Sequence, residues 1–126
     1  MAVRCLIVDD NRAFLEAART LLEREGLTIS GVATTSADAM RQAETLRPNV
    51  VLVDVSHGDE SGFELARRLV ADHARGASVI LISTRSEDDL ADAIARSPAA
   101  GFVSKSELSA EANRGLADEA SARPGR

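Results

Sequence analysis

The sequence predicts an α/β fold in which a five-stranded parallel sheet carries helices on both faces. Short apolar runs alternate five times with segments of helical spacing along the 126 residues. Such alternation favours parallel strands joined by right-handed helical crossovers. The runs at 50–53 and 79–82 are continuously apolar and rich in β-branched residues, as expected of central strands covered on both faces.

Each predicted element follows from its own stretch of sequence. The expected strands span residues 3–8, 27–33, 50–55, 78–83 and 101–104, and the expected helices span 11–25, 36–46, 62–73, 87–96 and 107–119. In the first helix, apolar spacing predicts one shared face, formed by Phe14, Leu15, Ala18, Leu21 and Leu22. Gly26 is a plausible C-cap for that helix, and Pro48 stops the second. Ser61 and Glu64 have capping-box spacing before the third.

Length and composition predict a single globular domain. A chain of 126 residues can bury one core, and its 44% hydrophobic and 28% charged residues are typical of a folded protein. We expect the domain to span residues 1–119 and residues 120–126 to form a flexible C-terminal tail.

Composition also argues against several partners. The net charge of -5 and the absence of Trp and Tyr argue against direct nucleic acid binding, which needs clustered cations or stacking aromatics. No apolar run reaches membrane-spanning length, so no membrane association is expected. The one cysteine, Cys5, lies in an apolar run and is expected to be buried and inert. A chain that cannot form an internal disulfide fits a reducing compartment, so we expect a cytoplasmic location.

Polar side chains gather where the predicted strands end. In a parallel sheet, the loops at the carboxyl ends of the strands converge on a crevice, so these residues are the site candidates. They are Asp9 and Asp10 after the first strand, Asp54 at the end of the third, Ser83 and Thr84 at the end of the fourth, and Lys105 after the fifth.

This set suits phosphoryl transfer. Three neighbouring carboxylates repel one another, and a hard divalent cation with oxygen ligands would relieve that repulsion. A carboxylate such as that of Asp54 can act as a nucleophile and form an acyl phosphate. The metal, Lys105 and Ser83 could then meet the charge of the phosphoryl group. Alternatively, Asp9 and Asp10 cap a helix, and Lys105 is only solvated.

Four segments resemble the receiver domains of two-component response regulators, and together they cover nearly the whole chain: LIVDDNRAFLEAARTLLEREG, VVLVDVSHGDESGFELARRL, VILIS and GFVSKSEL. The resemblance implies the flavodoxin-like strand order 2-1-3-4-5. It also implies that Asp54 accepts a phosphoryl group from a histidine kinase or phosphotransfer protein. Mg²⁺, or Mn²⁺ in its place, would be held by Asp9, Asp10, Asp54 and the backbone carbonyl of Ser56.

The resemblance further implies a conformational switch. Ser83 would turn toward the phosphoryl group and Phe102 would follow, and the face formed by the fourth helix, fifth strand and fifth helix could support a homodimer. Two residues depart from the family pattern. Gly58 replaces a usual Pro and should loosen its loop, and Thr84 replaces a smaller residue. We expect both to modulate the rates of phosphotransfer or dephosphorylation.

The sequence therefore predicts a phosphorylation-dependent signalling switch rather than an enzyme with an external substrate. One alternative is a degenerate receiver that acts as a phosphate-independent interaction module. Another is a phosphohydrolase with an Asp nucleophile, although such enzymes generally need a second acid where Ser56 stands.

Overall fold

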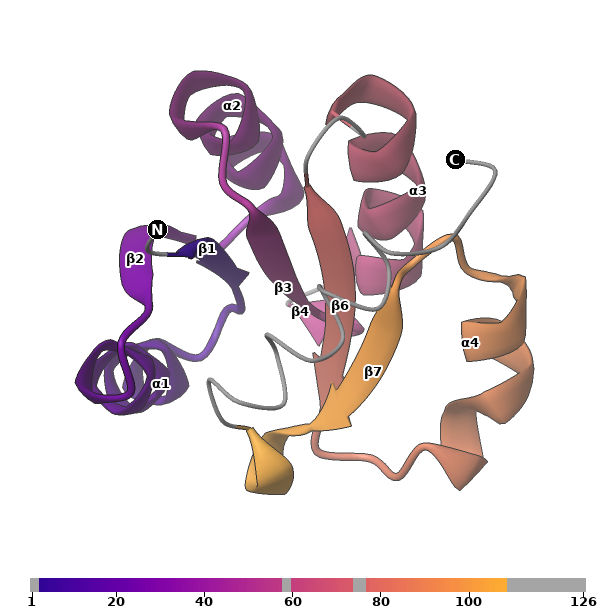
Figure 1. Ribbon diagram of the computed structural model, residues 1–126. Coiled ribbons are helices and arrows are strands. Elements are labelled where there is room, and N and C mark those ends of the chain that lie inside the picture. The colour runs from indigo at the N-terminus through magenta and orange to yellow at the C-terminus, as the bar shows by residue number, and fades with distance from the viewer. Residues whose placement is uncertain (1–2, 58–59, 74–76, 109–126) are drawn as a thin grey trace.

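The computed structural model describes residues 3–57, 60–73 and 77–108, and it shows a parallel sheet flanked by helices (Figure 1). The large sheet contains β1 (Arg4–Val8), β2 (Thr28–Ala33), β3 (Val50–Asp54), β6 (Ser78–Ser83) and β7 (Gly101–Ser104). The helices are α1 (Arg12–Arg24), α2 (Ser36–Leu46), α3 (Gly62–His73) and α4 (Ala91–Arg96). Two short strands, β4 (Ser56–His57) and β5 (Glu60–Ser61), form a separate hairpin.

The strand order of the large sheet is β2-β1-β3-β6-β7, and all neighbouring strands are parallel. When only the strands of this sheet are counted, the order is 2-1-3-4-5, which confirms the prediction. The chain runs outward from β1 to β2 and then returns to place β3 on the other side of β1. The order therefore reverses between β1 and β3, and the crevice at their carboxyl ends is where ligands of such sheets bind.

Apolar side chains on successive strand residues face opposite sides of the sheet. On one side, Cys5, Ile7 and Leu52 pack with the buried face of α1. On the other, residues of β1, β3 and β6 pack against α2, α3 and the start of α4; they are Leu6, Val8, Val51, Val53, Val79 and Leu81. Helices thus cover both faces, as predicted, and the central strands are apolar throughout because neither face is exposed.

Helix α1 begins just after Asp9 and Asp10, and both of its ends are capped. Asn11 is its N-cap, and the side chain accepts a hydrogen bond from the Phe14 backbone N–H at 3.1 Å. Gly26 has φ 102°, and its N–H donates to the Glu23 carbonyl while Leu27 N–H donates to the Leu22 carbonyl. This Schellman arrangement confirms the predicted glycine stop.

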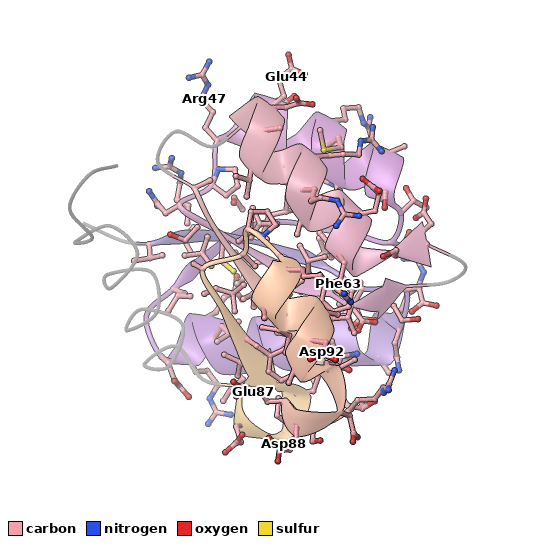
Figure 2. The ribbon with its side chains drawn as sticks, turned by 90° about the vertical axis from the view of Figure 1, so that its right-hand side faces the viewer. Glu44, Arg47, Phe63, Glu87, Asp88 and Asp92 are labelled. Carbon is pink, nitrogen blue, oxygen red and sulfur yellow. The ribbon has the colours of Figure 1, made fainter. Side chains whose placement is uncertain are left out.

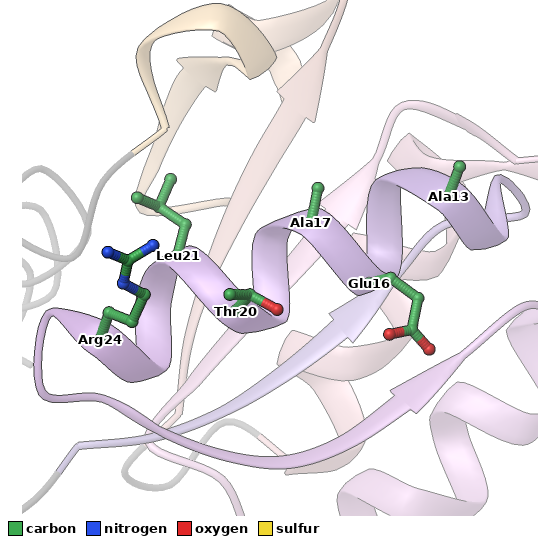
Figure 3. Close-up of a pocket in the computed structure, with 6 residues that line it drawn as sticks. All are labelled: Ala13, Glu16, Ala17, Thr20, Leu21 and Arg24. Atoms are coloured by element: carbon green, nitrogen blue, oxygen red, sulfur yellow. The ribbon is translucent and has the colours of Figure 1, made fainter.

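The apolar face of α1 is narrower than predicted. Leu15, Ala18 and Leu22 are buried, Phe14 is half-buried, and Leu21 is 39% exposed. Leu21 also lines a hollow on the outer surface of this helix (Figure 3), together with Ala13, Glu16, Ala17, Thr20 and Arg24. The buried stripe follows an i, i+3, i+7 spacing, which leaves Leu21 outside it.

Two predicted helices differ in the structure. The segment 87–96 begins with a 3₁₀ turn (Asp88–Leu90) before α4, because the turn buries Leu90 while the neighbouring acids stay in solvent. Figure 2 shows Glu87, Asp88 and Asp92 along this exposed side. The last predicted helix does not start at Glu107, since Lys105–Glu107 is a 3₁₀ turn and Leu108 is extended, with its side chain buried in the core. The rest of that helix and the predicted tail lie outside the described residues.

Membrane insertion was not expected from the sequence. In residues 3–57, 60–73 and 77–108, no helix combines the length and the apolar character that a bilayer crossing requires.

Because the thiol of Cys5 is buried, the free energy of unfolding should depend on pH in the alkaline range. Burial raises the pKa of this thiol from 9.0 to about 12. Between these values the unfolded chain loses the proton while the folded chain keeps it, so the free energy of unfolding falls as pH rises. We expect that free energy to fall by about 1.4 kcal/mol more per pH unit than in Cys5→Ala. Urea titrations followed by circular dichroism above pH 9 measure the difference, and parallel curves for the two proteins would contradict it.

The hairpin leads into α3 at Gly62, which has no room for a side chain. A Cβ atom there would clash with the Asp54 carbonyl oxygen and would lie 2.6 Å from the Val55 Cα, both backbone atoms. We predict that Gly62→Ala lowers the free energy of unfolding by more than about 1 kcal/mol. Gly31→Ala is the matched control, because its Cβ would meet only the flexible side chains of Gln42 and Leu46. If urea denaturation shows the same loss of unfolding free energy in both variants, the close approach of Gly62 to the backbone is not what excludes a side chain there.

Candidate functional site

Three carboxylates meet at the carboxyl edge of the sheet. Asp9 directly follows β1, Asp54 is the last residue of β3, and Asp10 lies beside them. Each offers an oxygen within 4.8 Å of the others. Asp9 is fully buried and Asp54 is 6% exposed, whereas Asp10 is exposed. The cluster thus has a buried floor and one side open to solvent.

The position of Asp9 is fixed by its own segment. Its backbone N–H donates to the Ala33 carbonyl at 3.0 Å, which ties the end of β1 to the end of β2. The Asp9 Oδ1 accepts a hydrogen bond from the Asn11 N–H at 2.9 Å. Asp9 Oδ2 is buried and accepts no hydrogen bond of normal geometry from the described residues. Its contact is an ion pair with Lys105 instead.

Lys105 places its ammonium among the carboxylates. The Nζ atom lies 2.5 Å from Asp9 Oδ2, 3.7 Å from Asp54 Oδ2 and 4.3 Å from the centroid of the Phe14 ring. The side chain is only 13% exposed. A buried carboxylate without a cationic partner is strongly unfavourable, so this ammonium makes the burial of Asp9 possible.

Lys105 is also the only lysine among the 15 basic residues of the chain. An ammonium is a compact point charge on a flexible stem, whereas a guanidinium is a broad planar fork. A narrow space beside two carboxylates and a ring suits the ammonium.

The donor set fits a hard divalent cation. Three carboxylates and one ammonium carry a formal charge of −2, so one divalent cation makes the site formally neutral. All the side-chain donors are oxygen, one of them is the buried Asp9 Oδ2, and Asp10 opens to solvent. Mg²⁺ prefers oxygen ligands and keeps several waters, which an open side allows.

Of the two hydroxyl residues at the end of β6, Ser83 is buried and Thr84 is exposed. Ser83 ends β6 next to Ser104 of β7, is 3% exposed, and accepts a hydrogen bond from the Arg85 N–H at 3.0 Å. Ser83 therefore lies at the same edge of the sheet as the carboxylates, with its hydroxyl oxygen held by the next turn of the chain.

Phe102 lies in β7, opposite Leu81 of β6, and is half-buried against the core cluster that α3 and α4 cover. Its side chain thus packs on the other side of the sheet from α1. The ring therefore packs at the edge of the core, and the switch role that the resemblance implies stays a prediction.

Two short described segments after Asp54 pair with each other. Ser56 is exposed and pairs with Ser61 in the β4–β5 hairpin, which was not predicted. Val55 N–H donates to the Ile82 carbonyl at 3.0 Å, and Gly62 N–H donates to the Val55 carbonyl at 2.8 Å. Gly58 lies outside the described residues.

Glu60 ties this hairpin to α2. Its carboxylate accepts a hydrogen bond from the backbone N–H of Ser36, the first residue of that helix, at 2.7 Å. The N-terminus of a helix carries unpaired N–H groups and partial positive charge, so it favours a carboxylate. The sequence pattern gives no sign of this contact because the two residues are 24 positions apart and belong to different elements.

The comparisons with known proteins agree on one family. The family model described as the response regulator receiver domain matches residues 5–113. Response regulator GacA of Pseudomonas viridiflava is 30% identical over 104 residues, which are 82% of this chain and 48% of the relative. The DNA-binding transcriptional activator EvgA of Escherichia coli K12 is 29% identical over 83% of this chain and 51% of its own. The chain thus spans about half the length of the curated relatives it matches.

A solved structure shows the same fold. The receiver domain of the putative response regulator NarL from Mycobacterium tuberculosis has a TM-score of 0.80 and 26% identity, and the match covers 97% of this chain and 98% of that one.

The contact between Glu60 and α2 should stabilise the loop that carries Ser56. Loss of a capping acceptor costs about 0.5–2 kcal/mol, so we predict that Glu60→Ala lowers the free energy of unfolding by an amount in this range. Glu60→Gln keeps an acceptor oxygen and should lose less. Glu64→Ala, which removes an exposed acid in the first turn of α3 and its pair with Arg67, is the control for loss of a surface carboxylate. A Glu60→Ala protein as stable in urea as Glu64→Ala would contradict the role of the contact.

Proposed function

The chain belongs to the family of response regulator receiver domains, and from this premise we propose that it is a phosphorylation-dependent switch of a two-component system with Asp54 as the phosphoryl acceptor. The observation that supports this most is the cluster at the sheet edge. There Asp54 lies in one cluster with Asp9, Asp10 and the Lys105 ammonium.

In this proposal the Asp54 carboxylate is the nucleophile. Its oxygen bonds to phosphorus of a phosphohistidine on a kinase or phosphotransfer protein, the phosphorus–nitrogen bond breaks, and the imidazole leaves with the electron pair. Asp54 suits the role because it ends a buried strand at 6% exposure and points into the cluster. The product is an acyl phosphate on the protein's own side chain, so the domain signals rather than turning over an external substrate.

Asp9, Asp10, Asp54 and the backbone carbonyl of Ser56 would hold Mg²⁺, with Mn²⁺ as a possible substitute. The bound ion would supply positive charge to the oxygens of the transferring phosphoryl group. Asp9 contributes a buried oxygen whose orientation is fixed by Asn11. The exposed Asp10 provides the side from which an ion and its waters enter.

Lys105 and Ser83 would stabilise the phosphorylated state. The ammonium already lies 3.7 Å from the Asp54 carboxylate, where it can meet a phosphoryl oxygen. The Ser83 hydroxyl would exchange its contact with Arg85 for one to the phosphoryl group, and Phe102 would adjust with it, as a shift between two populated states. Thr84 and Gly58 would modulate the lifetime of that state.

We also propose how the domain is used. A histidine kinase or phosphotransfer protein would be the donor, in the cytoplasm, and a homodimer could form through α4, β7 and the segment after them. EvgA is named a DNA-binding activator; we infer that the domain seen in the present chain does not itself bind DNA, because its net charge of -5 opposes contact with phosphates.

Phosphorylation of Asp54 can be tested with a small phosphoryl donor. We predict that incubation with acetyl phosphate and Mg²⁺ adds one phosphoryl group to the intact protein by mass spectrometry. The adduct should be absent from Asp54→Asn and from samples with excess chelator, because the nucleophile or the metal is missing.

The variant Asp72→Asn is a matched control, since Asp72 is an exposed acid at the far end of α3 and should be labelled like the wild type. If neither acetyl phosphate nor a histidine kinase labels the wild type, the domain is a phosphate-independent interaction module. Continuous release of phosphate from an added phosphoester, lost in Asp54→Asn, would instead indicate a phosphohydrolase.

A further inference from the structure

The ring of Phe14 lies over a charged group of the site, the Lys105 ammonium. Its ring centroid lies 4.3 Å from Lys105 Nζ, and the same ammonium lies 2.5 Å from Asp9 Oδ2. A cation at this distance from a ring face is attracted by the negative face of the π system, most strongly where water is largely excluded. The Lys105 side chain is 13% exposed, so its ammonium meets that condition.

The ring and the carboxylate are held by one continuous local structure. Asp9 Oδ1 accepts from Asn11 N–H, and Asn11 Oδ1 accepts from Phe14 N–H. Two hydrogen bonds therefore fix the backbone of Phe14 relative to Asp9. The half-buried Phe14 side chain packs against the core cluster on the α1 side. The β1–α1 segment thus presents both a carboxylate and a ring face to a lysine that comes from the end of β7.

From this geometry we propose that Phe14 is a positioning residue, whose ring face keeps the Lys105 ammonium directed at the carboxylate cluster. The ammonium lies at the end of a flexible stem, where it contacts the carboxylates of Asp9 and Asp54 and the face of the Phe14 ring. The attraction to the ring adds to that of the carboxylates and opposes movement of the ammonium out of the cluster. This role rests on the proposed function, because the positioned ammonium is the one that would meet the phosphoryl group.

An apolar residue of similar volume would fill the same space without attracting the ammonium. Leucine is such a residue, whereas tyrosine keeps the ring face. Phe14→Leu therefore removes the ring–ammonium contact while it keeps apolar packing, and Phe14→Tyr should keep both. Phe63→Leu is the matched control, because Phe63 is also half-buried but packs on the opposite side of the sheet, against the other core cluster.

The position of the ammonium can be read directly because the chain has a single lysine. Protein grown with ¹³C,¹⁵N-labelled lysine gives one set of lysine side-chain NMR signals, all from Lys105. We expect ring-current shifts of the ε protons in the wild type, Phe14→Tyr and Phe63→Leu, and their loss in Phe14→Leu. Circular dichroism melts check that each variant is folded.

The second measurement is the rate of adduct formation with acetyl phosphate and Mg²⁺. Loss of a desolvated cation–π contact predicts a rate about three- to thirty-fold lower in Phe14→Leu, with Phe14→Tyr and Phe63→Leu close to the wild type. The positioning role is overturned if Phe14→Leu has the lysine shifts of the wild type. It is also overturned if the shifts change but the rate of adduct formation stays that of the wild type. If the wild type itself forms no adduct, the proposed function fails, and the lysine shifts alone decide whether Phe14 positions the ammonium.

Discussion

The ion pair between the buried Asp9 carboxylate and the Lys105 ammonium is the interaction on which the rest of the site depends. A carboxylate at the end of an apolar strand is stable only if a cation reaches it, and Lys105 comes from the opposite end of the described chain. The sheet must therefore be complete from β1 to β7 before the site is neutralised. Folding and site assembly are coupled through this one pair.

The sheet topology explains why these residues meet. Strands β1 and β3 are central and parallel, so Asp9 and Asp54 end at the same edge and at a similar height. The reversal of strand order between them leaves space above the strand ends. Helix α1 is capped by Asn11, and its Phe14 ring lies over the Lys105 ammonium, while Glu60 ties the β4–β5 hairpin to α2.

Much of this architecture follows from the sequence alone, for reasons that differ between elements. The central strands were predictable because burial on both faces requires continuous apolar residues. The strand-end acids were predictable because a carboxylate such as that of Asp9 or Asp54, directly after a buried strand, is costly unless a cation or hydrogen bonds compensate it. The stop of α1 was predictable because Gly26 tolerates the left-handed conformation at φ 102°.

Other features depend on contacts between distant segments, which no local pattern encodes. The hairpin strands have two residues each, too few for a periodic signal. Phe14 matched the core pattern of α1, and its contact with Lys105 appears only when β7 is placed beside α1. Leu21 shared the same helical spacing and yet is exposed. Gly62 resembled an ordinary helix-start residue until its closeness to the Asp54 backbone was visible.

A Mg²⁺ titration followed by backbone amide NMR measures whether the carboxylate cluster binds one hard cation, since the chain has no Trp or Tyr for fluorescence. One such site gives saturable shifts of a single binding event, largest at the ends of β1 and β3 and at Lys105, and absent in Asp9→Asn. Shifts that stay linear with Mg²⁺, or that persist unchanged in Asp9→Asn, would contradict it.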